Sequence, residues 1–179
     1  APPAPIESSF QLLAYQAALH PDADCLGWRP LLTPGYVAPN PGAPHDESRP
    51  FLWWSYATVQ ELAVKMGRGL LAKFGLAKGD TVGMYARNCP WWAILSLACS
   101  SQGIVVVPIY DTLGPNIVQY VCNHAQVKVV VTTADHAQKV AAALPSCTSV
   151  KGIVLIEYNG SVEPSDTSKE TIGSAFSNI

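Results

Sequence analysis

Charged residues are scarce in this chain of 179 residues. Asp, Glu, Lys and Arg make up 13% of it, whereas about 25% is typical of soluble domains. The hydrophobic share of 49% is that of a globular protein. A free-standing domain of this size ordinarily carries more surface charge, so the composition favours part of a larger protein. We expect the remainder of that protein, or another protein, to cover its apolar surface.

A concentration of positive charge is also missing. Lys and Arg together number 11, are scattered along the sequence, and leave a formal net charge of −2. Nucleic-acid-binding domains ordinarily carry a basic patch or an excess of basic residues. The charge pattern therefore gives no basis for a nucleic-acid partner.

Metal-binding and secretion patterns are absent as well. The four histidines lie far apart, and zinc sites need clustered ligands, so no metal site is predicted. The Pro-rich start, Ala1–Pro5, has neither the basic residues nor the apolar run of a signal peptide. The cysteines are odd in number and never spaced C-x-x-C, which favours free thiols in a reducing intracellular compartment. They are Cys25, Cys89, Cys99, Cys122 and Cys147.

One uncharged stretch runs between Arg87 and Asp111. It is long enough to cross a bilayer, for which about 20 apolar residues suffice. Serines and Pro108 interrupt it, however, and Gln102-Gly103 is typical of a helix end before a β-branched strand. We predict a helix followed by a buried strand, not a membrane span.

Strand and helix patterns alternate over residues 57–158. Continuously apolar strands separated by helices are typical of a parallel sheet covered on both faces, with right-handed crossovers. The sequence therefore predicts an α/β fold with a mostly parallel, Rossmann-like sheet and helices on both faces. The expected strands are Val82–Ala86, Ile104–Pro108, Val127–Thr132 and Val150–Glu157, and the expected helices are Trp91–Ser101, one from Pro115, and Ala134–Leu144.

A smaller segment, residues 1–56, precedes this sheet. It contains a predicted helix, Ser9–Leu19, and a β-hairpin whose strands are joined by a Pro-rich loop at 31–50. Ser55 is predicted to cap the next helix, which has apolar residues at 3–4-residue spacing and ends at Gly75. Residues 159–179 turn polar and lose periodicity, so we expect a connector there.

A glycine motif lies inside that helix. Gly67-x-Gly69-x-x-Ala72 fits the dinucleotide-binding fingerprint, but that fingerprint must follow a strand, because its glycines turn backbone amides toward the pyrophosphate. Since it lies in mid-helix here, we interpret it as a site of close helix packing.

A polar corner follows the second expected strand and contains Tyr110, Asp111, Thr112 and Gly114. Ligands of open α/β sheets gather at the carboxyl ends of strands, and the free N–H groups of the following helix favour an anion. The alternative, which we favour, is structural: Asp111 or Thr112 caps that helix. These four residues are our candidates near a site, and no catalytic, cofactor-binding or metal-binding residue is predicted.

Several motifs carry a resemblance to a known family. Asn88–Trp92 and Val107–Gly114 resemble the N-terminal region of long-chain acyl-CoA synthetases, which are AMP-forming adenylating enzymes. Gly79–Gly83 and Trp54–Tyr56 are similar to further parts of that region. One residue departs from the pattern, because the family usually has Pro-Glu-Trp where this chain has Trp91 in the central position.

The resemblance implies a fatty acid–CoA ligase that uses ATP, Mg²⁺ and coenzyme A. In that reaction AMP is transferred to the carboxylate of a fatty acid, and the thiol of coenzyme A then displaces it. The resemblance also implies a Ser/Thr/Gly-rich phosphate loop ending in Lys, a later acidic motif and a C-terminal domain with a second Lys. None of these occurs in residues 1–179, so we expect the chain alone to be inactive and to bind none of these cofactors.

Three alternatives stay open. A non-catalytic relative that acts as a binding or scaffolding module would suit the substitution at Trp91. A small Rossmann-like domain that binds a nucleotide by itself is disfavoured, because no glycine turn follows a strand. Peripheral contact with an organelle membrane, of the endoplasmic reticulum, peroxisome or plastid, is a further alternative for its location.

Overall fold

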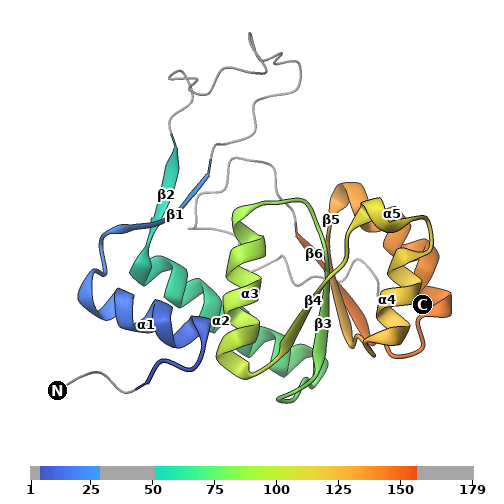
Figure 1. Ribbon diagram of the computed structural model, residues 1–179, viewed down its shortest axis with the longest axis horizontal. Coiled ribbons are helices and arrows are strands. Elements are labelled where there is room, and N and C mark those ends of the chain that lie inside the picture. The colour runs from blue at the N-terminus through green and yellow to red at the C-terminus, as the bar shows by residue number, and fades with distance from the viewer. Residues whose placement is uncertain (1–4, 29–50, 157–179) are drawn as a thin grey trace, which may run out of the picture.

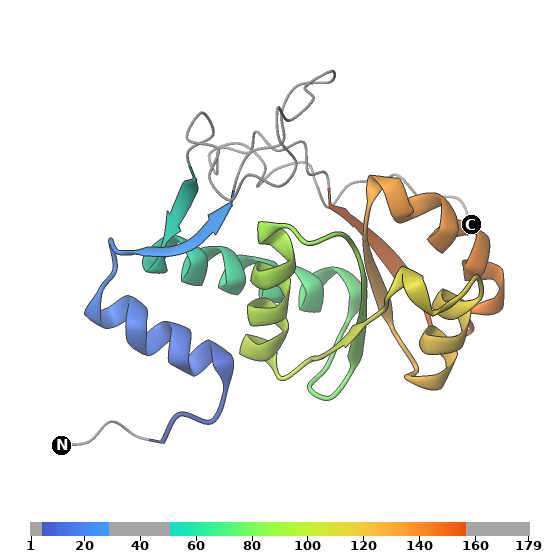
Figure 2. The same ribbon diagram turned by 45° about the horizontal axis from the view of Figure 1, so that its top comes forward.

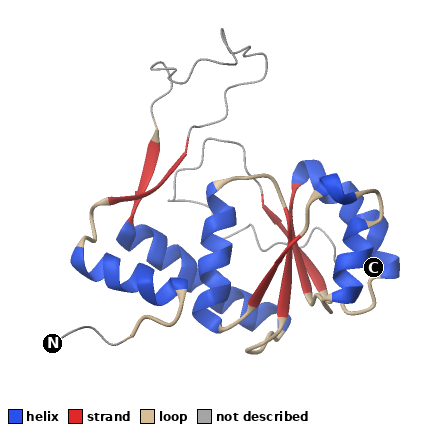
Figure 3. Cartoon of the chain, viewed as in Figure 1, coloured by secondary structure: helices blue, strands red, loops and turns tan. Residues whose placement is uncertain are grey.

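A computed structural model describes residues 5–28 and 51–156 of the protein. The predicted Pro-rich loop at 31–50 and the predicted connector at 159–179 lie outside the described residues. Figures 1 and 3 show a central sheet between helices, with a further helix and a two-stranded ribbon to one side.

The central sheet has four parallel strands. They are β3 (Thr81–Tyr85), β4 (Val105–Pro108), β5 (Val129–Thr133) and β6 (Gly152–Ile156), in the spatial order β4-β3-β5-β6. Val82 of β3 lies opposite Val106 of β4 on one side and Val129 of β5 on the other. This arrangement confirms the predicted parallel α/β sheet.

Helices cover both faces of this sheet (Figures 1 and 2). α2 (Tyr56–Phe74) and α3 (Pro90–Gln102) lie on one face, and α4 (Ile117–His124) and α5 (Ala134–Ala143) lie on the other. Val82, Val129 and Val130 of the two central strands are completely buried. Burying a valine side chain stabilises a fold by about 1.5–3 kcal/mol, so these strands gain from being apolar on both faces.

The N-terminal segment packs beside α2 and α3. It contains α1 (Ser9–Leu19), which Ser8 and Gln11 begin with a capping box, and the antiparallel strands β1 (Asp24–Trp28) and β2 (Leu52–Ser55). A two-stranded ribbon is marginally stable alone. An aromatic cluster attaches it: the ring centroid of Trp54 lies 4.5 Å from that of Trp28 and 5.3 Å from that of Trp91 in α3.

Three elements begin two residues later than the sequence predicts. α4 starts at Ile117, because Gly114, with φ of 107°, and the turn after it separate the helix from the preceding segment. Val127 and Val150 precede β5 and β6 and belong to turns, since their N–H groups donate to the carbonyls of Cys122 and Cys147. The pattern of apolar residues does not show at which residue the hydrogen bonds between strands begin.

The uncharged stretch between Arg87 and Asp111 contains α3 followed by β4, as predicted. Gly103, with φ of 68°, ends α3. In the ranges 5–28 and 51–156, no helix has the length and apolar character needed to cross a membrane.

Helices α2 and α3 approach each other closely at Gly67. A Cβ atom at this position would lie 2.9 Å from the carbonyl oxygen of Ala98 and 2.9 Å from Oγ of Ser101. The glycine motif therefore serves helix packing, as predicted.

We predict that Gly67→Ala destabilises the chain by about 1–3 kcal/mol, the usual range for overpacking. Ala gains about 1 kcal/mol over Gly in helix propensity, but the facing Ala98 oxygen belongs to the backbone and cannot turn aside. Urea unfolding measures the difference.

Arg68→Ala is the matched control, since it places the same residue on the exposed side of α2 and should change stability by less than about 0.5 kcal/mol. Equal stabilities of Gly67→Ala and the parent would contradict the close approach.

Candidate functional site

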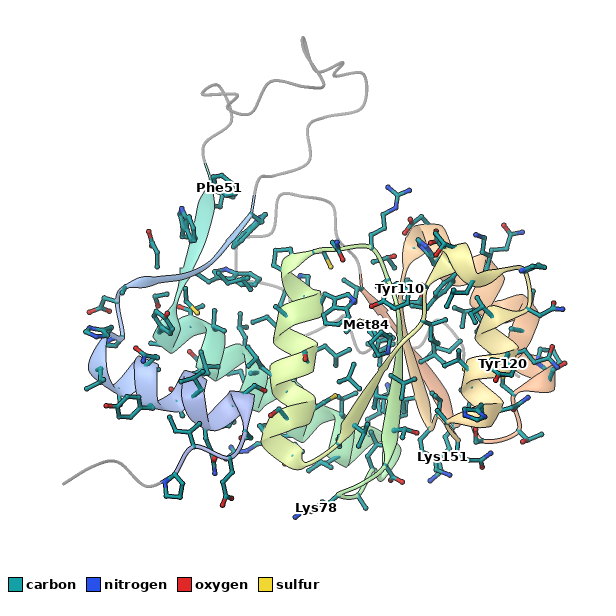
Figure 4. The ribbon with its side chains drawn as sticks, in the orientation of Figure 1. Phe51, Lys78, Met84, Tyr110, Tyr120 and Lys151 are labelled. Carbon is teal, nitrogen blue, oxygen red and sulfur yellow. The ribbon has the colours of Figure 1, made fainter. Side chains whose placement is uncertain are left out.

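The strand order reverses between β3 and β5. The chain moves outward from β3 to β4 and then crosses back to β5 on the other side of β3. Ligands of open α/β sheets bind at the carboxyl ends of strands beside such a reversal. The carboxyl edge of the sheet, where Figure 4 labels Tyr110, is therefore the candidate site; Lys78 and Lys151 lie at the opposite end.

Charged side chains from three strand ends meet at this edge. Arg87 follows β3, Asp111 follows β4, and Asp135 and His136 begin α5 after β5. Nε of Arg87 pairs with Oδ2 of Asp135, which lies 2.9 Å from Nδ1 of His136. Nε2 of His136 lies 3.7 Å from Oδ2 of Asp111. We name these four residues the carboxyl-edge cluster.

Neighbouring groups hold the imidazole of His136 in place. Its side chain is only 12% exposed, and the Tyr85 ring meets it edge-on, with centroids 4.7 Å apart. Oγ1 of Thr133 lies 3.4 Å from its Nδ1. The buried Thr132 hydroxyl donates to the Tyr85 carbonyl at 2.7 Å, which ties β5 to β3 just below the cluster.

The cluster changes the acidity of Asp135. Burial by itself would raise the pKa of this carboxyl, but hydrogen bonds from Thr133 and His136 and the charges of His136 and Arg87 outweigh it. The pKa falls from 3.8 to about 2. Asp135 is therefore ionised at any physiological pH and serves as the anion that orients Arg87 and His136.

The cluster offers little for a phosphate or a metal ion. Its guanidinium is already paired with a carboxylate, so it has no unpaired cation to clamp a triphosphate. Among residues 5–28 and 51–156, no three His, Cys, Asp or Glu side chains are grouped to hold a metal ion. What the arrangement does is join three strand ends through one imidazole.

The sequence-based candidates lie on this edge, but one proposed role is wrong. Asp111–Leu113 form a short 3₁₀ turn, and Asn116 stands at the N-cap of α4. Asp111 and Thr112 therefore do not cap α4, because the turn and Gly114 separate them from it. Asp111 faces His136 instead, and Tyr110 is 61% exposed.

Sequence reasoning missed Arg87, Asp135 and His136. They are distant in sequence, and only the parallel order of β3 and β5 brings them together. A usable signal was present, since each stands within four residues of the end of an expected strand.

The thiols of the chain are free, as predicted. Burial raises the pKa of Cys99 to about 12, and burial together with the neighbouring Cys147 raises the pKa of Cys122 to about 12. Thiols in this state are protonated at neutral pH and are poor nucleophiles. They pack as small apolar side chains.

Comparison with known proteins gives the family. The sequence profile described as AMP-binding enzyme matches residues 16–177. The chain belongs to the AMP-binding enzyme family.

Curated relatives of this chain extend well beyond it. It is 36% identical to the probable CoA ligase CCL6 of Humulus lupulus over 74% of the chain and 20% of the relative. It is 31% identical to Long chain acyl-CoA synthetase 2 of Arabidopsis thaliana over 82% of the chain and 20% of the relative. It is 41% identical to long-chain-fatty-acid–CoA ligase 6 of Homo sapiens over 51% of the chain and 13% of the relative. The chain thus spans about a fifth of these relatives or less.

Solved structures share the fold of this chain. A putative long-chain-fatty-acid CoA ligase from Rhodopseudomonas palustris matches with a TM-score of 0.64 and 23% identity, covering 84% of this chain and 33% of that one. A fatty acyl CoA synthetase from Mycobacterium tuberculosis matches with a TM-score of 0.66 and 22% identity, covering 84% and 27%. At these identities the likeness concerns the fold.

We predict that Asp135→Asn lowers the free energy of unfolding at neutral pH, and that this difference from the parent disappears in acid. Because the pKa of Asp135 is depressed in the folded state, its stabilising contribution is present above about pH 4 and is lost as pH falls toward about 2. The expected loss at neutral pH is about 0.5–1 kcal/mol, as for a partly exposed ion pair.

Urea unfolding of parent and variant between neutral and acid pH measures this difference. Asp22→Asn, in the exposed turn before β1, is the control. Its free energy of unfolding should follow that of the parent at each pH. A difference for Asp135→Asn that stays constant down to about pH 3 would contradict the depressed pKa.

Proposed function

We propose that this chain is the N-terminal part of a long-chain fatty acid–CoA ligase. The supporting observation is its 31–41% identity to relatives named as CoA ligases or long-chain acyl-CoA synthetases. The motif Val107–Gly114, which spans β4 and the 3₁₀ turn after it, resembles the long-chain branch of these enzymes. The reaction is ATP + long-chain fatty acid + CoA giving acyl-CoA, AMP and diphosphate.

The chemistry places demands on the whole enzyme. A carboxylate is unreactive because its oxygen is a poor leaving group, and transfer of AMP to it creates a good one. Developing charge on the departing diphosphate must be met by cations, with Mg²⁺ and lysine as the groups that the resemblance implies. Arg87 is held by Asp135, so the carboxyl-edge cluster supplies no such clamp.

The role that we propose for this chain is structural support of the site. In this proposal the described residues 57–156 belong to one subdomain, whose carboxyl edge presents Tyr110, Asp111, Thr112 and Gly114 toward the remainder of the enzyme. Tyr110 and Leu113 are each more than 60% exposed, and apolar side chains this exposed are typical of a surface that another part covers. Five free thiols favour a reducing compartment for the enzyme.

The first functional prediction is that the chain alone shows no ATP–pyrophosphate exchange with any fatty acid. Joined to its natural continuation, it should catalyse exchange with long-chain fatty acids and much less with acetate. Isotope exchange into ATP measures both. Exchange by the chain alone would contradict the proposal, and a joined protein without exchange would favour the non-catalytic binding module.

The second prediction concerns Asp111 in the joined enzyme. Asp111→Ala removes the partner of His136 at the end of β4, so at about pH 5.5, where an imidazole is protonated, we expect a loss of about 0.2–1 kcal/mol in stability with little change in preferred chain length. Thermal melting and turnover with fatty acids of different length measure the two effects. A variant that melts like the parent but loses turnover would place Asp111 among the reacting groups.

A further inference from the structure

One imidazole lies between two carboxylates at the carboxyl edge. Nδ1 of His136 is 2.9 Å from Oδ2 of Asp135, and its Nε2 is 3.7 Å from Oδ2 of Asp111. The two carboxylates come from different parts of the chain. Asp135 stands beside His136 in α5, whereas Asp111 stands in the turn after β4.

The protonation state of the ring decides how many of these carboxylates it can hold. Asp135 is ionised and nearer, so a neutral ring keeps its single proton on Nδ1 and donates it there. Nε2 then carries a lone pair that faces the negative oxygen of Asp111, and the contact is repulsive. A protonated ring donates from both nitrogens and attracts both carboxylates.

We propose that His136 is a pH-dependent positioning residue: its protonated ring bridges Asp135 and Asp111 and fixes the Tyr110–Gly114 turn against α5, and its neutral ring releases Asp111. The bridge holds a segment that has few other attachments, since every residue from Tyr110 to Gly114 is exposed. The inference does not depend on the ligase activity proposed above.

The other groups around the ring do not replace this bridge. From β3 and the residues just after it come the Tyr85 ring, which meets the imidazole edge-on, and Arg87, which pairs with Asp135. The pKa of the Cys89 thiol, just before α3, is raised mainly by burial, and the negative charge of Asp135 raises it further. The link between His136 and the turn after β4 is the contact with Asp111.

Amide hydrogen exchange of residues 110–114 and 116 tests the proposal in the full chain, at about pH 5.5 and about pH 8, on either side of the range in which histidine changes charge. The intrinsic rates at each pH are divided by the measured exchange rates to give protection factors. We expect protection of these amides to be about two- to fivefold higher at the lower pH, the range for a partly exposed ion pair.

Two variants should abolish this pH dependence. Asp111→Asn removes the charge that a protonated ring attracts, at an exposed position where folding is not at risk, and His136→Asn removes the imidazole. His124→Asn is the matched control, because His124 is an exposed histidine in α4 that stacks on Tyr120, and it should keep the pH dependence.

Equal protection at the two pH values in the parent would overturn the proposal. Retention of the pH dependence in Asp111→Asn would also overturn it, whatever the behaviour of His136→Asn. Neither result involves ATP, fatty acid or coenzyme A, so failure of this proposal and failure of the ligase proposal are distinguishable.

Discussion

The two central strands, β3 and β5, are buried on both faces, and the positions of the other elements depend on this constraint. A parallel pair needs a crossover between its strands, and here the crossovers are helices that cover the two faces. The same pairing aligns the carboxyl ends of the strands. Arg87 and Asp135, 48 positions apart, meet because Tyr85 and Thr132 are partners in one ladder.

The layer formed by α2 and α3 depends on a second constraint, which is the absence of a side chain at Gly67. This glycine lets the helices approach until backbone and side-chain oxygens of α3 fill the space that a Cβ would need. Trp91 of α3 meets Trp54 of the ribbon. The tryptophan that departs from the family pattern therefore has a packing role at the junction between the ribbon and the sheet layer.

Apolar periodicity and capping residues determined what could be predicted from the sequence. Ser9–Leu19 and the helix capped by Ser55 and ended by Gly75 follow from local signals, and both are confirmed. The starts of β5 and β6 were placed too early, because Val127 and Val150 are apolar but donate to turn carbonyls. The prediction that Asp111 caps α4 was wrong for a related reason, since the pattern of apolar residues does not reveal the 3₁₀ turn that separates Asp111 from the helix. The cluster around His136 requires strand order, which local signals do not contain.

The distribution of tryptophan gives this chain an uneven optical signal. All five tryptophans lie in the ribbon and in α3: Trp28, Trp53, Trp54, Trp91 and Trp92. Helices α4 and α5 and strands β5 and β6 contain none. Intrinsic fluorescence therefore reports separation of the ribbon from α3, whereas far-ultraviolet circular dichroism reports all helices together. Unfolding curves that coincide by these two probes would establish that the ribbon and the sheet unfold as one cooperative unit.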